Sequence, residues 1–234
     1  MPRSLLKLSL LGVICLLSTS SIAQLAQKSE IGFGLGVFNY TGDLVRTYDL
    51  TTSKPAATVF YRTNISRVIS FRIALTGGQL AASDRHHPID SFAFKRNASF
   101  NIFLLEAAGT FEYHFLDWRD DRRRLRFTPY LFAGAALFGI SGNAKKTAQY
   151  SNVQVAIPFG VGMKYVLTPK YYIGFEIGIR KTFFDYLDNI SQGNTSNKNN
   201  LHFGNPNDYD NYFFTGITLT YTFYDIPCPT NPYR

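Results

Sequence analysis

The sequence predicts an all-β protein, an eight-stranded antiparallel transmembrane outer-membrane β-barrel. Three observations predict this fold. Apolar residues alternate with small or polar residues at period two, from Glu30 to Phe223. Shorter and long connections between these segments alternate strictly, as in barrels with turns on one side of the membrane and loops on the other. Aromatic residues make up 16% of the chain, and aromatic side chains gather at both membrane interfaces of such barrels.

The first three expected strands have an apolar face opposite a face of small, polar and charged residues. They lie at 30–38, 56–63 and 68–80. In the first, glycines occupy the second face, which indicates a crowded interior where backbones approach closely. Arg62 and Arg72 share the face of the small residues in the other two. We therefore expect these charges inside the barrel.

The fourth and fifth expected strands lie at 100–115 and 127–140. Glu106 and Glu112 share one face of the fourth, and two carboxylates on a buried face are costly in a dry core. They indicate a polar lumen. The fifth is apolar or small on both faces, so its phase stays open.

The last three expected strands, at 153–167, 171–184 and 212–223, keep the alternation. A soluble β-sandwich would show a similar pattern, with its charged face toward water. Sandwich strands are usually about 5 to 6 residues long, whereas these segments are longer, which favours the barrel.

The connections give the expected orientation. The shorter ones lie at 64–67, 116–126 and 168–170, and the long ones lie at 39–55, 81–99, 141–152 and 185–211. Outer-membrane barrels have short periplasmic turns and longer outer loops, and an even number of strands puts both termini on one side. We expect both termini in the periplasm.

The N-terminus has the layout of a secretory signal peptide. Arg3 and Lys7 give a basic start, an apolar run covers residues 8–17, and Ala23 precedes Gln24 at the expected cleavage site. The apolar run is shorter than the roughly 20 residues that a transmembrane helix needs. The expected organisation is a signal peptide at 1–23, a barrel at 24–223 and a Pro-rich periplasmic tail at 224–234.

Seven charged residues fall on the expected lumen faces: Arg62, Arg72, Glu106, Glu112, Lys164, Glu176 and Arg180. They form either an ion or solute pathway or a network that plugs the barrel. The interior of an eight-stranded barrel is just wide enough for side chains to fill it, which favours the plug. We expect Arg180 to pair with Glu176 or Glu106.

The charge pattern and motifs exclude several functions. A formal net charge of +8 is spread over segments of both signs rather than along one basic stripe, so we expect no nucleic-acid binding. His86, His87 and Asp90 lie in an expected outer loop without a third ligand at a diagnostic spacing, which favours a solvated loop over a metal or acid-base site. We expect no enzyme, no cofactor and no small-molecule substrate.

Two segments on the expected periplasmic side are candidates for partner contact. The turn 118–126 carries Arg122, Arg123 and Arg124, and the tail carries Tyr224 and Tyr233. The alternatives are a charged, solvated turn and a disordered chain end.

Four short segments resemble the PorG-type barrel of the type IX secretion system: Asn39-Tyr40-Thr41-Gly42-Asp43-Leu44, Pro129-Tyr130, Ile157-Pro158-Phe159-Gly160-Val161-Gly162, and Arg180 followed by Asp185-Tyr186-Leu187-Asp188. The resemblance implies an outer-membrane component associated with a periplasmic PorK and PorN ring in a Bacteroidota-like bacterium. It carries over no catalytic or cofactor residue. The Asn-rich loop after Asp188 and the Pro-rich tail depart from the family pattern and leave room for a paralogue with another role.

Two hypotheses follow. The chain is a structural or anchoring component of the type IX protein secretion machinery, surrounded by outer-membrane lipid. Alternatively, it is a free-standing small barrel for solute passage, adhesion or outer-surface catalysis.

Overall fold

The structure, a computed structural model, describes residues 29–42, 44–45, 48, 52–83, 99–118, 126–141, 151–183, 187 and 210–223. The expected signal peptide with Ala23 and Gln24, the candidate loop residues His86, His87 and Asp90, and the candidate docking residues Arg122, Arg123, Arg124, Tyr224 and Tyr233 lie outside these ranges. Among the described residues, no helix is long and apolar enough to cross a membrane.

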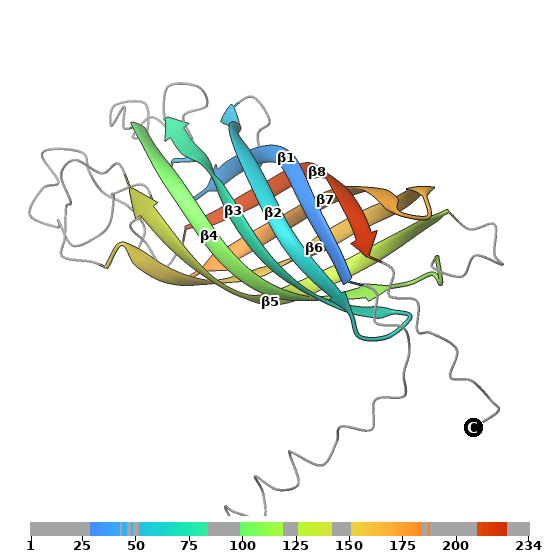
Figure 1. Ribbon diagram of the computed structural model, residues 1–234. Coiled ribbons are helices and arrows are strands. Elements are labelled where there is room, and N and C mark those ends of the chain that lie inside the picture. Colours follow the sequence, from blue (N-terminus) through green and yellow to red (C-terminus); the bar gives the residue numbers. More distant parts are fainter. Residues whose placement is uncertain are drawn as a thin grey trace, which may run out of the picture. The chain divides into compact units, whose positions relative to one another are not determined.

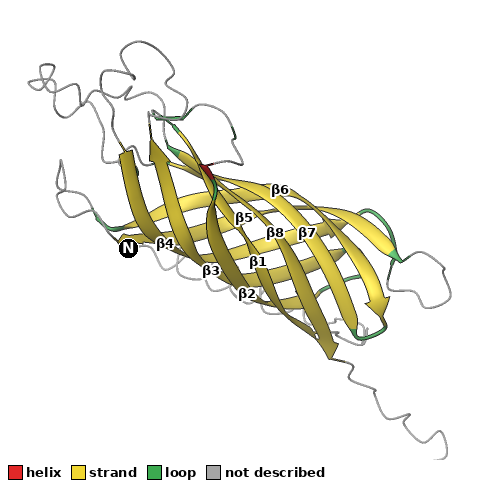
Figure 2. Cartoon of the chain, turned by 90° about the horizontal axis from the view of Figure 1, so that it is seen from above, coloured by secondary structure: helices red, strands yellow, loops and turns green. Residues whose placement is uncertain are grey.

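Eight strands form one closed antiparallel barrel (Figure 1; Figure 2). They are β1 (Ser29–Thr41), β2 (Lys54–Asn64), β3 (Ile69–Ser83), β4 (Ser99–His114), β5 (Phe127–Ser141), β6 (Val153–Thr168), β7 (Tyr171–Thr182) and β8 (Asn211–Phe223). Each strand pairs with its neighbour in sequence, and β1 closes the barrel against β8. The predicted fold class is confirmed.

The two ends of the barrel differ in their connections. Ser29 at the start of β1 pairs with Phe223 at the end of β8, so these two strand ends meet at one end of the barrel. The connections β2–β3, β4–β5 and β6–β7 lie at the same end, which we call the turn end (right-hand side of Figure 1). The connections β1–β2, β3–β4, β5–β6 and β7–β8 belong to the opposite end, the loop end, and span 11 to 28 residues, against 2 to 12 residues at the turn end.

Side chains alternate between an exposed outer face and a buried lumen, because successive residues of a strand point to opposite sides of the sheet. In β8, Ile217 is 60% exposed and its neighbour Thr218 is 6% exposed. Toward the turn end the outer face carries exposed aromatic side chains: Tyr61, Tyr113, Phe127, Tyr165, Tyr171 and Phe223. Tyrosines at this level match the aromatic girdle at a membrane interface.

The structure resolves the phase of β5. Leu131 and Leu137 point outward, whereas Tyr130, Phe132 and Phe138 are buried in the lumen. Both faces are apolar because the lumen is itself partly apolar, and this is why the pattern of β5 leaves its phase open.

Two features of β6 depart from a regular strand. Opposite Pro158 the β5–β6 pairing skips Gly134 and Ala135, because proline has no N–H to donate. Gly160 faces Gly178 of β7, and a Cβ added at Gly160 would lie 2.8 Å from the Phe132 ring and 2.3 Å from the Ile177 carbonyl oxygen. Glycine is therefore needed at Gly160 to seat Phe132 in the lumen.

Candidate functional site

The inside of the barrel holds a continuous set of buried charges, which we call the lumen ion network. It consists of four carboxylates and four cations, each at most 4% exposed: Glu30, Glu106, Glu112, Glu176, Arg62, Arg72, Lys164 and Arg180. All seven charged residues that the sequence assigns to the lumen belong to it. The structure adds Glu30, which shares its face of β1 with the glycines.

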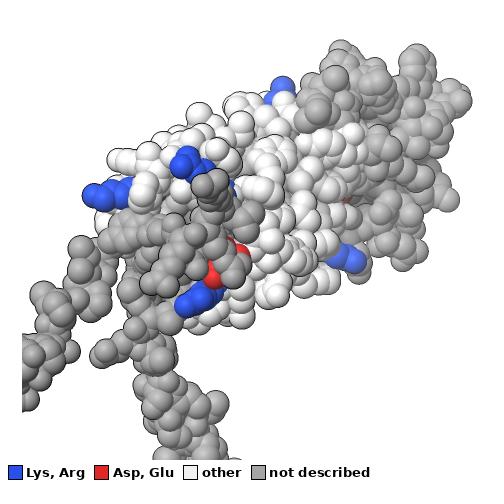
Figure 3. All heavy atoms as spheres, turned by 90° about the vertical axis from the view of Figure 1, so that its right-hand side faces the viewer, with Lys and Arg blue, Asp and Glu red and all other residues white. Residues whose placement is uncertain are grey.

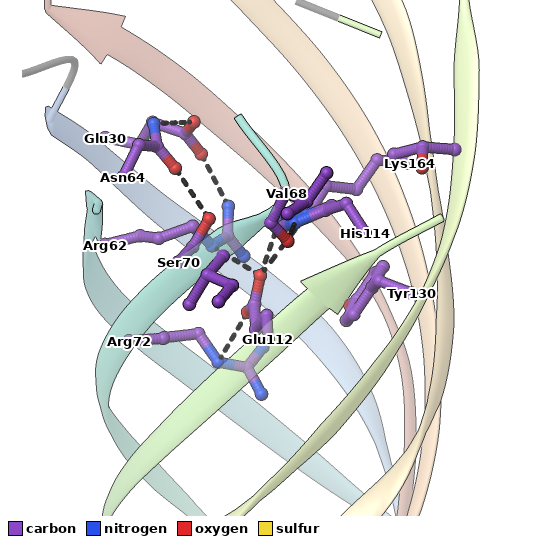
Figure 4. A network of polar contacts seen from close by, with 12 residues as sticks. Glu30, Arg62, Asn64, Val68, Ser70, Arg72, Glu112, His114, Tyr130 and Lys164 are labelled. Atoms are coloured by element: carbon purple, nitrogen blue, oxygen red, sulfur yellow. Dashed lines mark hydrogen bonds and ion pairs between the residues drawn. The ribbon is translucent and has the colours of Figure 1, made fainter. Parts of the chain in front are cut away.

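Glu112 of β4 is the centre of the network (Figure 4). Its Oε2 atom lies 2.9 Å from Arg62 Nε and 2.7 Å from Lys164 Nζ, and its Oε1 atom lies 3.2 Å from Arg72 Nε. The three cations come from β2, β6 and β3. One carboxylate thus joins four strands across the interior.

The network continues from Arg62 toward the turn end. Arg62 Nη1 donates to Glu30 Oε2 at 2.6 Å, and Asn64 Nδ2 donates to Glu30 Oε1 at 2.7 Å. Ser70 Oγ then donates to Asn64 Oδ1 at 2.8 Å (Figure 4). Buried charges are tolerated when their remaining hydrogen-bonding positions are filled in this way.

The network also runs from Arg72 toward the loop end. Arg72 Nη1 lies 2.5 Å from Glu176 Oε2, which also accepts a hydrogen bond from the Tyr130 hydroxyl at 3.1 Å. Arg180 Nε lies 3.3 Å from Glu106 Oε2, and Arg180 Nη2 lies 3.9 Å from Glu176 Oε1. Arg180 therefore contacts both carboxylates that the sequence offers it, with Glu106 the closer.

Trp118 fills the turn end of the lumen. Its side chain is buried and packs edge-on against Tyr172, with ring centroids 4.6 Å apart. Lys164 Nζ lies 5.8 Å from the centre of the Trp118 ring and 4.8 Å from the centre of the Tyr130 ring, which are cation–π distances. The sequence predicts 118–126 as an exposed, charged turn, and for Trp118 this is wrong, because the large ring gains more by leaving water.

An apolar cluster fills the loop end. Its larger members are Phe38, Tyr40, Leu44, Leu80, Phe100, Ile102, Leu104, Phe138, Ile140, Leu187, Tyr212 and Phe214. Tyr212 joins this cluster to the ion network by donating its hydroxyl to Glu106 Oε2 at 2.6 Å. The lumen is thus charged toward the turn end and apolar toward the loop end.

Asp210 links three segments at the loop end by hydrogen bonds. Its carboxylate accepts a hydrogen bond from the Tyr40 hydroxyl and another from the backbone N–H of Leu187, at 2.9 Å for the latter. Its carbonyl oxygen accepts from the Thr182 hydroxyl. One buried residue therefore holds β1, β7 and a residue of the β7–β8 connection together.

The network contains residue types that carry out acid-base chemistry elsewhere. His114 Nε2 lies 2.7 Å from Lys164 Nζ, close to Glu112, and His114 Nδ1 lies 3.3 Å from the Val68 carbonyl oxygen (Figure 4). His114 is 0% exposed and Lys164 is 3% exposed. Among the described residues no group of three or more His, Cys, Asp or Glu side chains has an arrangement that could hold a metal ion. Among the described residues each charge of the network faces an opposite charge, and these ion pairs link strands across the lumen.

Filling of both lumen halves predicts the electrical behaviour of the barrel. In planar bilayers we expect the purified protein to give no large, stable channel, since side chains occupy the path that water and ions would take. Porin-like conductance from protein that has passed a gel-shift test of folding would contradict a filled lumen.

The closed sheet, the buried ion network and the apolar outer face define a small transmembrane β-barrel of the outer-membrane type. The chain belongs to the family described as "Domain of unknown function (DUF6089)", which matches residues 7–231. No curated protein matches the sequence.

Solved barrels share this architecture at low sequence identity. Neisserial surface protein A (NspA) is 10% identical, with a TM-score of 0.53, covering 83% of this chain and 97% of that chain. Ail, the attachment invasion locus protein of Yersinia pestis, in complex with the heparin analogue sucrose octasulfate, is 11% identical, with a TM-score of 0.47, covering 85% and 100%. OprG from Pseudomonas aeruginosa is 9% identical, with a TM-score of 0.44, covering 86% and 97%. The likeness to NspA establishes a common fold and nothing finer.

Proposed function

We propose that the chain is a non-enzymatic outer-membrane β-barrel that acts as a structural, anchoring component of the type IX protein secretion machinery. The filled lumen is the observation that supports this most. In the part of the chain that the structure describes, an ion network and an apolar cluster occupy the interior of the barrel, which argues against passage of a solute. Its two ends and its lipid-facing side are then the surfaces left for binding.

The residues that carry the PorG-type resemblance support the same proposal. Tyr40 donates to Asp210, Tyr130 donates to Glu176, and Arg180 lies against Glu106. Gly160 makes room for Phe132. The motifs thus coincide with positions that fill the lumen, so the resemblance and the structural argument concern the same feature.

In this proposal the turn end and both termini face the periplasm, and a PorK and PorN-type ring is the partner. Packing of Trp118 against Tyr172 fixes the residue that directly precedes the segment carrying Arg122, Arg123 and Arg124. The tail with Tyr224 and Tyr233 follows β8, which ends at the same end of the barrel. Both candidate docking segments are therefore attached to strand ends at the turn end.

The test is to remove the candidate docking residues and keep the barrel. One variant deletes residues 225–234, and another replaces Arg122, Arg123 and Arg124 by Gln. We expect both to reach the outer membrane folded, and we expect recovery of periplasmic ring proteins after crosslinking to fall. The matched control is Lys181→Gln, which neutralises an exposed cation at the loop end.

Unchanged crosslinking and unchanged protein secretion in both variants would contradict periplasmic docking. Protein secretion that is also unchanged after deletion of the whole gene would favour the free-standing barrel, with adhesion or outer-surface catalysis at its loop end.

A further inference from the structure

The lipid-facing side of the barrel has a groove of about 610 Å³ across β3, β4, β5 and β6. Its size lies within the roughly 300 to 1,000 Å³ of ordinary ligand sites. The side chains that line it on the outer face are Ile69, Phe111, Leu131, Ala133, Phe159 and Val161.

The groove exists because a small residue lies between two aromatic residues. Ala133 of β5 pairs in register with Phe111 of β4 on one side and with Phe159 of β6 on the other. Both aromatic side chains are about half exposed, Phe111 at 57% and Phe159 at 42%. The outward methyl group of Ala133 therefore lies at the bottom of the groove, between the side chains of Phe111 and Phe159.

The groove occupies the turn-end half of the apolar outer face. Tyr113, one of the girdle aromatics, also lines it, and Ala133 lies near the middle of β5. It thus extends from the membrane interface at the turn end into the apolar layer. Apart from Tyr113, the side chains that line it on the outer face are hydrocarbon and suit a hydrocarbon chain aligned with the strands. The girdle end of the groove is where the headgroup of such a molecule would lie.

Two cations lie in turn-end connections of strands that line the groove. Arg67 lies in the turn that precedes β3, and Arg126 immediately precedes β5. Both are exposed, and Arg67 remains 71% exposed at the side chain although its Nη1 atom lies 3.6 Å from Asp117 Oδ2. Figure 3 looks onto the turn end and shows Lys and Arg side chains spaced around it.

We propose that this groove binds one phospholipid of the leaflet at the turn end, with an acyl chain over Ala133 and an anionic headgroup at Arg67 and Arg126. The apolar lining of the groove would bind the acyl chain. The two arginines would bind the anionic headgroup, since a basic residue near the membrane surface attracts anionic lipid. The proposal depends on the barrel fold alone and not on a role in secretion.

The test is native mass spectrometry of the full chain released from nanodiscs of mixed phosphatidylglycerol and phosphatidylethanolamine. The wild type is expected to keep one phospholipid, enriched in phosphatidylglycerol. Ala133→Leu should fill the groove and remove the retained lipid. Ala107→Leu is the matched control, because Ala107 is an exposed small residue of β4 that does not line the groove.

The headgroup arm uses Arg67→Gln and Arg126→Gln. Each should lower the preference for phosphatidylglycerol about fivefold, from roughly 1 kcal/mol per basic residue at a membrane surface. Lys181→Gln at the loop end should leave the preference unchanged. All variants are first checked for folding by the gel shift.

Equal lipid retention in Ala133→Leu and Ala107→Leu would overturn the proposal, as would retention without headgroup preference. A second copy of the chain or another protein held at the groove, sensitive to Ala133→Leu, would also overturn it and identify a protein interface instead.

Discussion

Replacing Glu112 by Gln is expected to destabilise the barrel by about 3 to 5 kcal/mol, because it removes the charge that three buried cations share. Arg62, Lys164 and Arg72 all lie within 3.2 Å of the Glu112 carboxylate. The neutral amide leaves an excess of positive charge among side chains that are at most 4% exposed. The loss is measured as the free energy of unfolding by urea in lipid vesicles, followed by the shift in gel mobility.

Two further variants separate charge balance from simple disruption. Glu112→Gln combined with Lys164→Met removes one cation together with the anion, so it should recover part of the lost stability. Glu30→Gln should have a smaller effect, because Glu30 lies at the turn-end margin of the network, where it pairs with Arg62, whereas three cations surround Glu112. A loss no larger for Glu112→Gln than for Glu30→Gln would show that Glu112 is not the centre of the network.

The course of the strands and the side of each lumen charge could be predicted from the sequence. A strand has a side-chain period of two, and a slip of one residue would put every charge into lipid. Arg72, Lys164 and Glu176 are therefore tolerated only on the lumen face of the sheet. The same argument applies to Glu30, which lies two residues before Gly32 and therefore on the same face of β1 as Gly32 and Gly34.

The pairings across the lumen could not be predicted in the same way. Glu176 of β7 contacts Arg72 of β3, and Glu112 of β4 contacts Lys164 of β6, although these strands are not neighbours in the sheet. Such contacts depend on the tilt and cross-section of the closed barrel, which no local pattern encodes.

Two local features resist sequence reasoning for a different reason. The inner face of β5 is apolar because Phe138 joins the apolar cluster and the rings of Tyr130 and Phe132 lie against Lys164 and Arg72, so alternation alone does not show which face of β5 points into the lumen. Trp118 stands beside a run of charges that resembles a solvated turn, and it is buried because a cavity bordered by Tyr172 and Lys164 accepts its ring. Both outcomes depend on what lies opposite in space.

Introducing Arg at Phe175 is expected to cost about 2 to 4 kcal/mol, the range for a basic residue at the bilayer midplane on the lipid face of a barrel. Phe175 is 46% exposed and lies in register with Met163 and Ile217, which are also exposed, so its surroundings on the outer face are apolar on both sides. An arginine there has no carboxylate within reach and must draw water or headgroups into the hydrocarbon layer.

The matched control is Ile65→Arg. Ile65 is 48% exposed, close to the 46% of Phe175, but it lies in the β2–β3 turn. There the cost of an arginine should fall to about 0 to 1 kcal/mol, because its charge reaches the aqueous interface. Assembly is measured as the folded fraction after insertion into vesicles and as the amount recovered in the outer membrane. The two sites match in exposure and both receive an arginine, and they differ in their depth in the membrane. Equal tolerance of arginine at both would mean that the face bearing Phe175 does not contact lipid, and the division into an apolar outside and a charged inside would then have to be abandoned.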